Sequence, residues 1–180
     1  VPAQDALNAD GETPAWKDWQ PSTPAERASY ADQLVADVAE LNTYVHSQDF
    51  TDALAAQGIG GISNGAIGLL DEVATGKISG EEDWWSGTDL YDFAANVEGS
   101  KMAFSLVQDF ATASGEKGAA LVTKIQQGYD DLDASLATHG SLGAGFVAYG
   151  ELTEADKREF TDLINALAEP LSQLTSTILE

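Results

Sequence analysis

The amino-acid sequence predicts an all-α protein, an antiparallel bundle of roughly four to five helices. Apolar residues recur at spacings of three and four through most of the chain, as they do on the buried face of a helix. Short polar or glycine-containing connections separate these periodic segments, and strand-like alternation does not stand out. With 180 residues, of which 43% are hydrophobic, the chain is long enough to bury a core.

Residues 1–24 are predicted to form an extended arm that precedes the bundle. Four of the five prolines lie here, and proline removes a backbone donor and disfavours helix in the residue before it. Trp16 and Trp19 are expected to dock the arm on a helix surface, with an aromatic binding platform as the alternative. Residues 25–180 are assigned to the helical bundle.

The first helix is predicted from about residue 25 to 46. Thr23 can cap it, Pro24 suits its first turn, and Glu26 completes a capping box. His46 lies at the C-terminal end, where we expect it to interact with the helix dipole rather than to bind a metal. Apolar residues at helical spacing predict one buried stripe, made of Tyr30, Leu34, Val38, Leu41 and Val45.

A short helical piece over 50–57 and a second helix from about 63 to 74 are predicted next, separated by a glycine-rich break at 58–61. The break is not a phosphate loop, because no strand precedes it and no Lys-Ser or Lys-Thr pair follows it. Asp71 and Glu72 lie near the end of the second helix. Carboxylates there oppose the helix dipole, so we expect a cation to compensate them.

Three further helices are predicted. The first runs from near residue 88 to about 113, the next over 116–137, and the last begins at Thr153 and is interrupted or bent at Pro170. Residues 138–149 are expected to form an extended connection, with a short strand as the alternative. The apolar periodicity of the three helices predicts core positions at Leu90, Phe93, Val97, Phe104, Leu121, Ile125, Tyr129, Leu132, Leu136, Phe160, Leu163, Ile164, Leu167, Leu171, Leu174 and Ile178.

Composition limits the partners. Eight basic residues against 30 acidic ones give a formal charge of -22, which argues against binding nucleic acid or an anionic membrane and favours cations. A merely solvated acidic surface is the alternative. Without cysteine, a metal must be held by oxygen atoms or by the two histidines. We expect no membrane span, because no apolar run approaches the roughly 18 residues that a span needs.

The stretch 76–101 concentrates acidic and aromatic side chains in a loop that enters a helix. They are Glu81, Glu82, Asp83, Asp89, Asp92 and Glu98, with Trp84, Trp85, Tyr91 and Phe93. Within the helix, Asp89, Asp92 and Asn96 recur at three and four residues and form one polar stripe. Such a stripe can face the interior of a bundle and hold a hard cation such as iron, calcium, magnesium or manganese. A solvated acidic face is the alternative.

Residues 64–101, with Glu81-Glu-Asp-Trp-Trp-Ser-Gly-Thr-Asp-Leu-Tyr-Asp-Phe93 at their centre, closely resemble the imelysin-like family, specifically its EfeO-type branch. The segments 152–156 and 166–172 resemble the end of the same domain. This resemblance implies an all-helical, extracytoplasmic, metal-binding domain of two related bundles. It also implies service in an iron-uptake system with a ferrous-iron permease and a haem peroxidase as partners.

The chain departs from the family pattern in two places. It resembles mainly the second bundle, because neither His46 nor His139 begins the His-x-x-Glu motif of the first. Gly87 stands where EfeO-type members usually carry histidine. By resemblance, the acidic wall of the cleft between the bundles and its supporting amide consist of Glu72, Glu81, Glu82, Asp89, Asp92 and Asn96.

The sequence and the resemblance together predict a metal-binding component of an iron-uptake system. The metal is expected to be iron, with calcium or zinc as alternatives, and the first bundle is expected to be missing or on another chain. The location is expected to be periplasmic or extracellular, with anchoring through a preceding segment as an option. The alternatives are a metal-degenerate interaction module, a metal-bridged polysaccharide binder and, least expected because histidine is scarce, a metallopeptidase.

Overall fold

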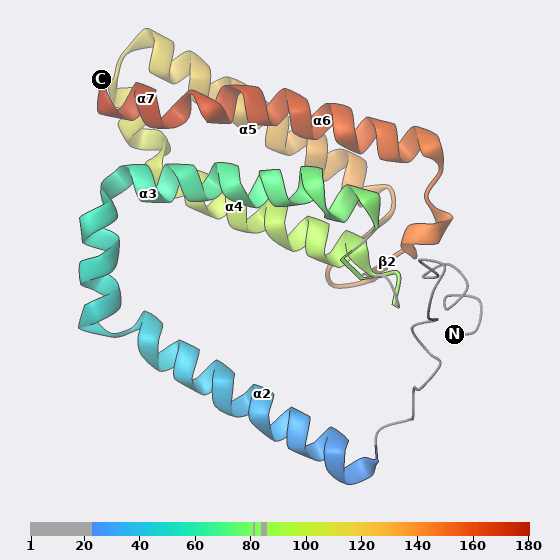
Figure 1. The fold of residues 1–180 in the computed structure, drawn as a ribbon. Helices are drawn as coiled ribbons and strands as arrows, with labels where there is room; N and C mark the ends of the chain where they lie inside the picture. Colours follow the sequence, from blue (N-terminus) through green and yellow to red (C-terminus); the bar gives the residue numbers. More distant parts are fainter. Residues whose placement is uncertain (1–22, 81, 84–85) are drawn as a thin grey trace, which may run out of the picture. The chain divides into compact units, whose positions relative to one another are not determined.

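The structure is a computed structural model that describes residues 23–80, 82–83 and 86–180. The chain divides into two compact units, residues 1–56 and 57–180, and each is described by itself. Helices make up most of both units, as the sequence predicted (Figure 1). The predicted arm, including Trp16 and Trp19, lies outside the described residues apart from its last two positions.

In the first unit, helix α2 spans Pro24–Val45. Its start is the predicted capping box: the Glu26 amide donates to Thr23 Oγ1 at 3.2 Å, and the Thr23 amide donates to Glu26 Oε2 at 2.8 Å. At the other end His46 is the C-cap residue, and its Nδ1 lies 2.7 Å from the carbonyl oxygen of Asn42. The predicted bounds of this helix agree with the structure to one residue.

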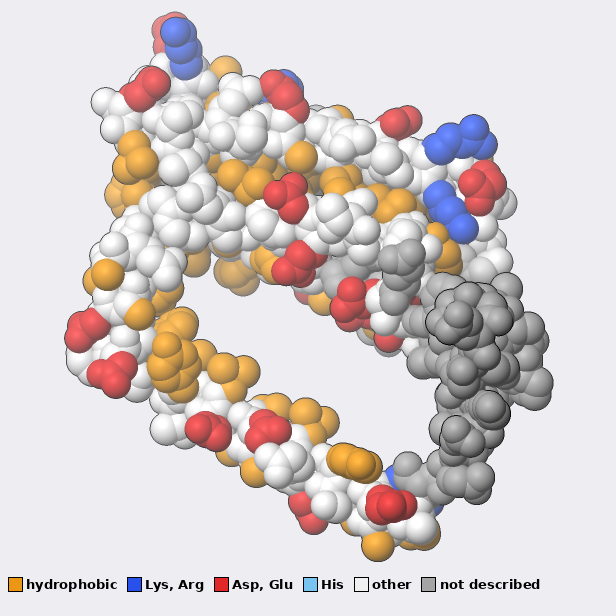
Figure 2. Space-filling view, in the orientation of Figure 1, with side chains coloured by type: hydrophobic (Ala, Val, Ile, Leu, Met, Phe, Trp, Pro, Cys, Tyr) orange, Lys and Arg blue, Asp and Glu red, His pale blue; other side chains and the backbone are white. Residues whose placement is uncertain are grey.

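The apolar stripe of α2 is exposed. Within the first unit α2 contains no buried residue, so the described residues of this unit do not bury the predicted stripe. Within this unit the described helical neighbour of α2 is the short segment 48–56, and Tyr44 and Phe50 make an edge-to-face contact at the turn, with ring centroids 5.3 Å apart. A segment that short cannot cover a helix of 22 residues. Figure 2 shows hydrophobic side chains at the surface along α2.

Helix α3 spans Gln48–Thr75 and contains one break. Gly58 has φ 65° and ψ -169°, a conformation that is strained for residues with a Cβ atom. The predicted break over 58–61 therefore narrows to one residue, and helix resumes directly after it. The part of α3 beyond Gly58 belongs to the second unit, where Ser63, Ala66, Leu70 and Val73 are buried.

Among the described helices, α3 is long and apolar enough to cross a membrane by length and composition alone. This segment differs from the prediction, in which no apolar run reached the length of a span. Core helices of bundles meet the same two criteria, and α3 supplies four buried residues to the core of the second unit. It is also interrupted at Gly58. Length and composition therefore do not distinguish a span from a core helix here.

The second unit is an antiparallel bundle (Figure 1). The later part of α3 is followed by α4 (Asp89–Ala113), α5 (Glu116–Ala137) and α6 (Glu154–Ser172). A short helix, α7 (Leu174–Leu179), completes it. Pro170 lies inside α6, and the helix ends after Ser172 rather than at the proline.

Two irregular connections close the ends of the bundle. Between α3 and α4 lie a 3₁₀ turn, η1 (Lys77–Ser79), and the acidic loop. Between α5 and α6 lie two short antiparallel strands, β1 (Gly140–Ser141) and β2 (Gly145–Phe146), in which Gly140 pairs with Phe146. A second 3₁₀ turn, η2 (Tyr149–Glu151), follows them. The strand pair corresponds to the short strand that the sequence left open as an alternative.

The core of this unit contains most of the positions that periodicity predicted. Phe93 of α4 meets Phe160 of α6 edge to face, with centroids 5.1 Å apart. Leu121, Leu163 and Ile178 are only partly buried. The buried hydrophobic side chains of α4, α5 and α6 are Leu90, Phe93, Ala94, Val97, Phe104, Val107, Ala111, Val122, Ile125, Tyr129, Leu132, Leu136, Phe160, Ile164, Leu167 and Leu171.

A buried polar contact links three helices through the core. Ser100 Oγ of α4 donates to the carbonyl oxygen of Ala66 in α3 at 2.6 Å. The same hydroxyl lies 2.6 Å from the Tyr129 hydroxyl of α5. Burial raises the pKa of Tyr129 to about 12, because the phenolate would lose its hydration. The tyrosine is therefore neutral and can take part in this hydrogen bond at physiological pH.

Candidate metal site

The acidic loop between α3 and α4 closes on itself through its backbone. The Gly87 amide donates to the Asp83 carbonyl oxygen at 2.7 Å. Gly87 has φ 68°, in the left-handed region that glycine adopts without steric cost. Gly87, the position at which the resemblance led us to expect a histidine, therefore makes a tight turn whose positive φ favours glycine.

Asp83 and Asp89 meet at the start of α4. The Asp83 amide donates to Asp89 Oδ1 at 3.0 Å, and Thr88 Oγ1 donates to Asp83 Oδ2 at 2.5 Å. Thr88 is the N-cap residue, as the sequence allowed, but its side chain makes no capping hydrogen bond because it is turned to Asp83. Asp89 is only 1% exposed. The helix N-terminus favours this buried negative charge.

Glu72 and Asn96 come together from different helices. Asn96 Nδ2 in α4 donates to Glu72 Oε2 in α3 at 3.0 Å and to the carbonyl oxygen of Leu69 at 3.0 Å. A cation was expected to compensate the negative charge of Glu72 near the end of α3. The described partner of this carboxylate is the uncharged amide of Asn96. Asn96 holds the carboxylate in place and leaves Glu72 Oε1 without a hydrogen bond among the described contacts, which is compatible with binding a cation.

The remaining predicted ligands are distributed around the same end of the bundle. A methyl group at Gly76 would lie 3.8 Å from Glu82 Oε2, so the Glu82 carboxylate lies close to the end of α3. Asp92 is half-buried in the first turn of α4. Glu81 lies outside the described residues.

The structure does not assemble these side chains into a complete metal site within its described residues, where no group of three His, Asp or Glu side chains could hold an ion. The donors that it does describe are carboxylate and amide oxygens, which suit a hard cation rather than zinc in a histidine-rich site. The chemistry of the set therefore fits an oxygen-bound metal, and the described geometry supplies pairs rather than a full shell.

Glu98 lies apart from these carboxylates. It lines a cavity of about 450 Å³ between α4, α5 and the β1–β2 hairpin, together with Lys101 and Asp133. Lys101 Nζ donates to Asp133 Oδ2 at 2.6 Å, and this hydrogen bond raises the pKa of Lys101. None of the predicted site residues that the structure describes lines this cavity.

The two histidines lie in different units. His46 belongs to the first unit, at the end of α2. His139 belongs to the second, where its ring meets Phe160 edge to face and its Nε2 lies 3.9 Å from Asp156 Oδ1. Hydrogen bonds from Thr153 lower the pKa of Asp156, with a smaller contribution from His139.

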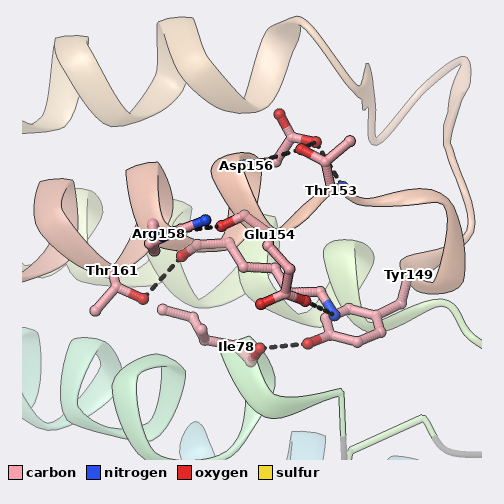
Figure 3. Close-up of polar contacts among 8 residues, drawn as sticks. Ile78, Tyr149, Thr153, Glu154, Asp156, Arg158 and Thr161 are labelled. Carbon is pink, nitrogen blue, oxygen red and sulfur yellow. Dashed lines mark hydrogen bonds and ion pairs between the residues drawn. The ribbon is translucent and has the colours of Figure 1, made fainter.

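Two residues at the site were missed by sequence reasoning. Asp83 was counted in the acidic stretch but not among the ligands, although it contacts Asp89 directly. Tyr149 was assigned to an extended connection, yet its hydroxyl donates to the carbonyl oxygen of Ile78 at 2.5 Å (Figure 3). Asp83 could have been found from its place in the acidic run. Tyr149 could not, because 71 positions separate it from Ile78.

Comparison with known proteins agrees with the resemblance noted in the sequence. The model of the imelysin family matches residues 5–177. An "Efem/EfeO family lipoprotein" of Staphylococcus aureus (strain NCTC 8325 / PS 47) is 34% identical over 170 residues, which cover 88% of this chain and 56% of the relative. A protein of the same description from Staphylococcus haemolyticus (strain JCSC1435) is 38% identical over 144 residues, covering 80% and 46%. The chain thus spans about half the length of these curated relatives.

Proposed function

The chain belongs to the imelysin family, and from this premise we propose that it is an extracytoplasmic metal-binding component of an iron-uptake system. Carboxylates of the 71–92 region bind the metal, which is cargo in this proposal. The observation that carries it is the contact of Asn96 with Glu72 between α4 and α3, which leaves Glu72 Oε1 without a hydrogen bond among the described contacts, at the end of the bundle where α4 begins with Asp89 and Asp92.

The electrostatics of this end support a cation as the ligand. Asp89 is buried, and its Oδ1 accepts one backbone hydrogen bond from Asp83. A further positive charge would stabilise this carboxylate and those around it, because attraction between charges is stronger where water is excluded. The overall charge of -22 raises the local concentration of cations in addition.

The proposal places the rest of the metal shell on another part of the protein. The ligands described here amount to one wall, and we propose that a first imelysin-like bundle supplies the facing wall, as the family resemblance implies. Because the relatives are described as lipoproteins, we further propose that this protein works outside the cytoplasmic membrane and is anchored to it. A ferrous-iron permease and a haem peroxidase are its proposed partners.

Isothermal titration with ferric citrate, and separately with calcium, tests the proposal. The double variant Asp89→Asn plus Asp92→Asn keeps the shape of both side chains and removes two charges. We expect the Kd to rise at least about tenfold, since each lost carboxylate ligand weakens a hard-cation site. Circular dichroism checks that the variant remains folded.

A charge-matched control distinguishes a defined binding site from general attraction of cations by the net charge. Asp109→Asn plus Asp162→Asn removes the same two charges elsewhere on the surface, and we expect little change in the Kd. An equal loss in both double variants would show that cations are attracted by net charge alone. Identical isotherms for wild type and the Asp89/Asp92 variant would remove these residues from the site.

A second candidate function, a helical interaction module that no longer binds metal, is favoured by one observation. Within the first unit, the whole apolar stripe of α2 is left uncovered, including Leu34 and Leu41. Under this proposal, the stripe docks on a first imelysin-like bundle. Native mass spectrometry of the chain mixed with such a bundle would then show a stable complex and no retained metal, whereas a metal-loaded complex would favour the first candidate.

A further inference from the structure

Tyr149 contacts both ends of the acidic loop. Its hydroxyl donates to the carbonyl oxygen of Ile78 at 2.5 Å, on the α3 side of the loop (Figure 3). Its backbone amide donates to the carbonyl oxygen of Gly87 at 2.8 Å, on the α4 side. One residue therefore bridges the two points at which the loop leaves η1 and enters α4. The described carboxylates Glu82 and Asp83 lie between these points in the chain.

The tyrosine is itself held from two sides. Its backbone forms the first position of η2, where the Leu152 amide donates to the Tyr149 carbonyl oxygen at 3.1 Å. Its ring packs on the core beside Ile78, and Lys157 Nζ lies 4.5 Å from the ring centroid. Lys157 in turn lies 3.6 Å from Glu154 Oε1. This packing holds the hydroxyl in a defined position.

Gly80 leaves room for the ring. A Cβ atom at Gly80 would lie 2.2 Å from Tyr149 Cε1, far inside contact distance. Gly80 also has φ 76°, which disfavours residues that carry a Cβ atom. The loop backbone thus passes directly over the face of the tyrosine, and both the position and the conformation of Gly80 require glycine.

From these contacts we propose that Tyr149 is a positioning residue that holds the acidic loop in its cation-binding conformation. It does not bind the metal. It ties Ile78 and Gly87 to the α5–α6 connection, so that the Asp83 amide stays on Asp89 and Glu82 stays beside the end of α3. The cation-binding part of this proposal rests on the proposed function, whereas the restraint on the loop does not.

Two substitutions separate the hydroxyl from the ring. Tyr149→Phe keeps the core contacts and removes the hydrogen bond to Ile78, and Gly80→Ala forces the loop and the ring apart. Hydrogen exchange followed by mass spectrometry reports on peptides that cover residues 76–88. For Tyr149→Phe we expect exchange there to become about fivefold to tenfold faster, as loss of one hydrogen bond predicts, and at least as much for Gly80→Ala.

Matched controls show whether the effect is specific. Tyr91→Phe removes a hydroxyl that has no hydrogen bond to the described residues, and Gly65→Ala adds a methyl group where nothing lies within 4 Å. Neither is expected to change exchange in the loop. Unchanged exchange in Tyr149→Phe, or an equal increase in Tyr91→Phe, would overturn the proposal.

Calcium titration of the same proteins connects the loop to binding. If Tyr149 positions the ligands, the Kd of Tyr149→Phe rises by about the factor by which the ordered loop is depopulated. Exchange fast enough to show that the ordered loop is a minority state, together with an unchanged Kd, would overturn the positioning role. If the wild-type chain binds no calcium or ferric citrate while exchange still responds, the proposed function fails and the restraint of the loop by Tyr149 stands.

Discussion

Helices α2 and α5 have the same length, 22 residues, and opposite environments. Both carry apolar side chains at helical spacing, yet α2 has no buried residue, whereas seven positions of α5 are buried between α4 and α6. Periodicity therefore defines which face of a helix is apolar, and a partner is needed to bury it. In the second unit the chain supplies that partner through neighbouring helices, and in the first unit its described residues do not.

Truncating one leucine in each helix tests this difference most directly. Leu132 in α5 is 0% exposed and Leu41 in α2 is 59% exposed. We expect Leu132→Ala to lower the free energy of unfolding by about 2–5 kcal/mol, because it removes buried methyl groups and leaves a cavity. The same change at Leu41 should cost less than about 0.5 kcal/mol. Urea unfolding measures both, and an equal loss would show that the α2 stripe is covered in solution.

The stability of the protein at alkaline pH tests the burial of Tyr129 in α5. Its folded pKa of about 12 exceeds the ordinary value of 10, so its contribution is complete below pH 10 and is lost as the pH rises toward 12. Two pKa units correspond to roughly 2–3 kcal/mol. We expect the free energy of unfolding of wild type to fall by that amount relative to Tyr129→Phe across this window.

The exposed Tyr30 of α2 gives the control for this measurement. Tyr30→Phe leaves Tyr129 in place, so we expect this variant to retain the alkaline loss of stability. At neutral pH, Tyr129→Phe should cost about 1 kcal/mol, because the hydrogen bond to Ser100 is removed. A parallel pH profile for wild type and Tyr129→Phe would contradict the assignment of the loss to this residue.

The smallest effects are expected at two capping boxes of the same kind, one at the start of α2 and one at the start of α6. Thr153→Ala should lower the free energy of unfolding of the second unit by about 1 kcal/mol. Thr23→Ala should reduce helicity in far-ultraviolet circular dichroism and leave the cooperative transition of that unit unchanged, because α2 packs against none of its own unit's helices along its length. A shift of that transition by Thr23→Ala would show that the two units are coupled.

The Thr153→Ala variant is also expected to change how the stability depends on pH. Hydrogen bonds from Thr153 lower the pKa of Asp156 in the folded chain. A lowered folded pKa contributes stability above the unfolded pKa, and that stability is lost as the pH falls through the folded value. Thr153→Ala should therefore flatten the acid side of the stability profile, measured by thermal unfolding between neutral and acid pH.

Local patterns predicted the helices closely because the signals that start and end a helix are local. The capping boxes at Thr23 and Thr153, and the break at Ser114-Gly115, define helix ends within a few residues of sequence. The candidate site was harder to predict from the sequence. Asp89 and Asp92 follow from spacing, whereas the pairing of Glu72 with Asn96 depends on how α3 and α4 pack.

By itself, the sequence determined the helical class, the helix bounds, the acidic loop and the resemblance to the imelysin family, because periodicity, caps and motifs are encoded by neighbouring residues. Only the tertiary structure decided that the described helices of the first unit leave the α2 stripe uncovered, that Asp89 is buried against the Asp83 amide, and that Tyr149 bridges Ile78 and Gly87. Those features depend on contacts between residues brought together by packing. Such contacts leave no periodic trace in the chain.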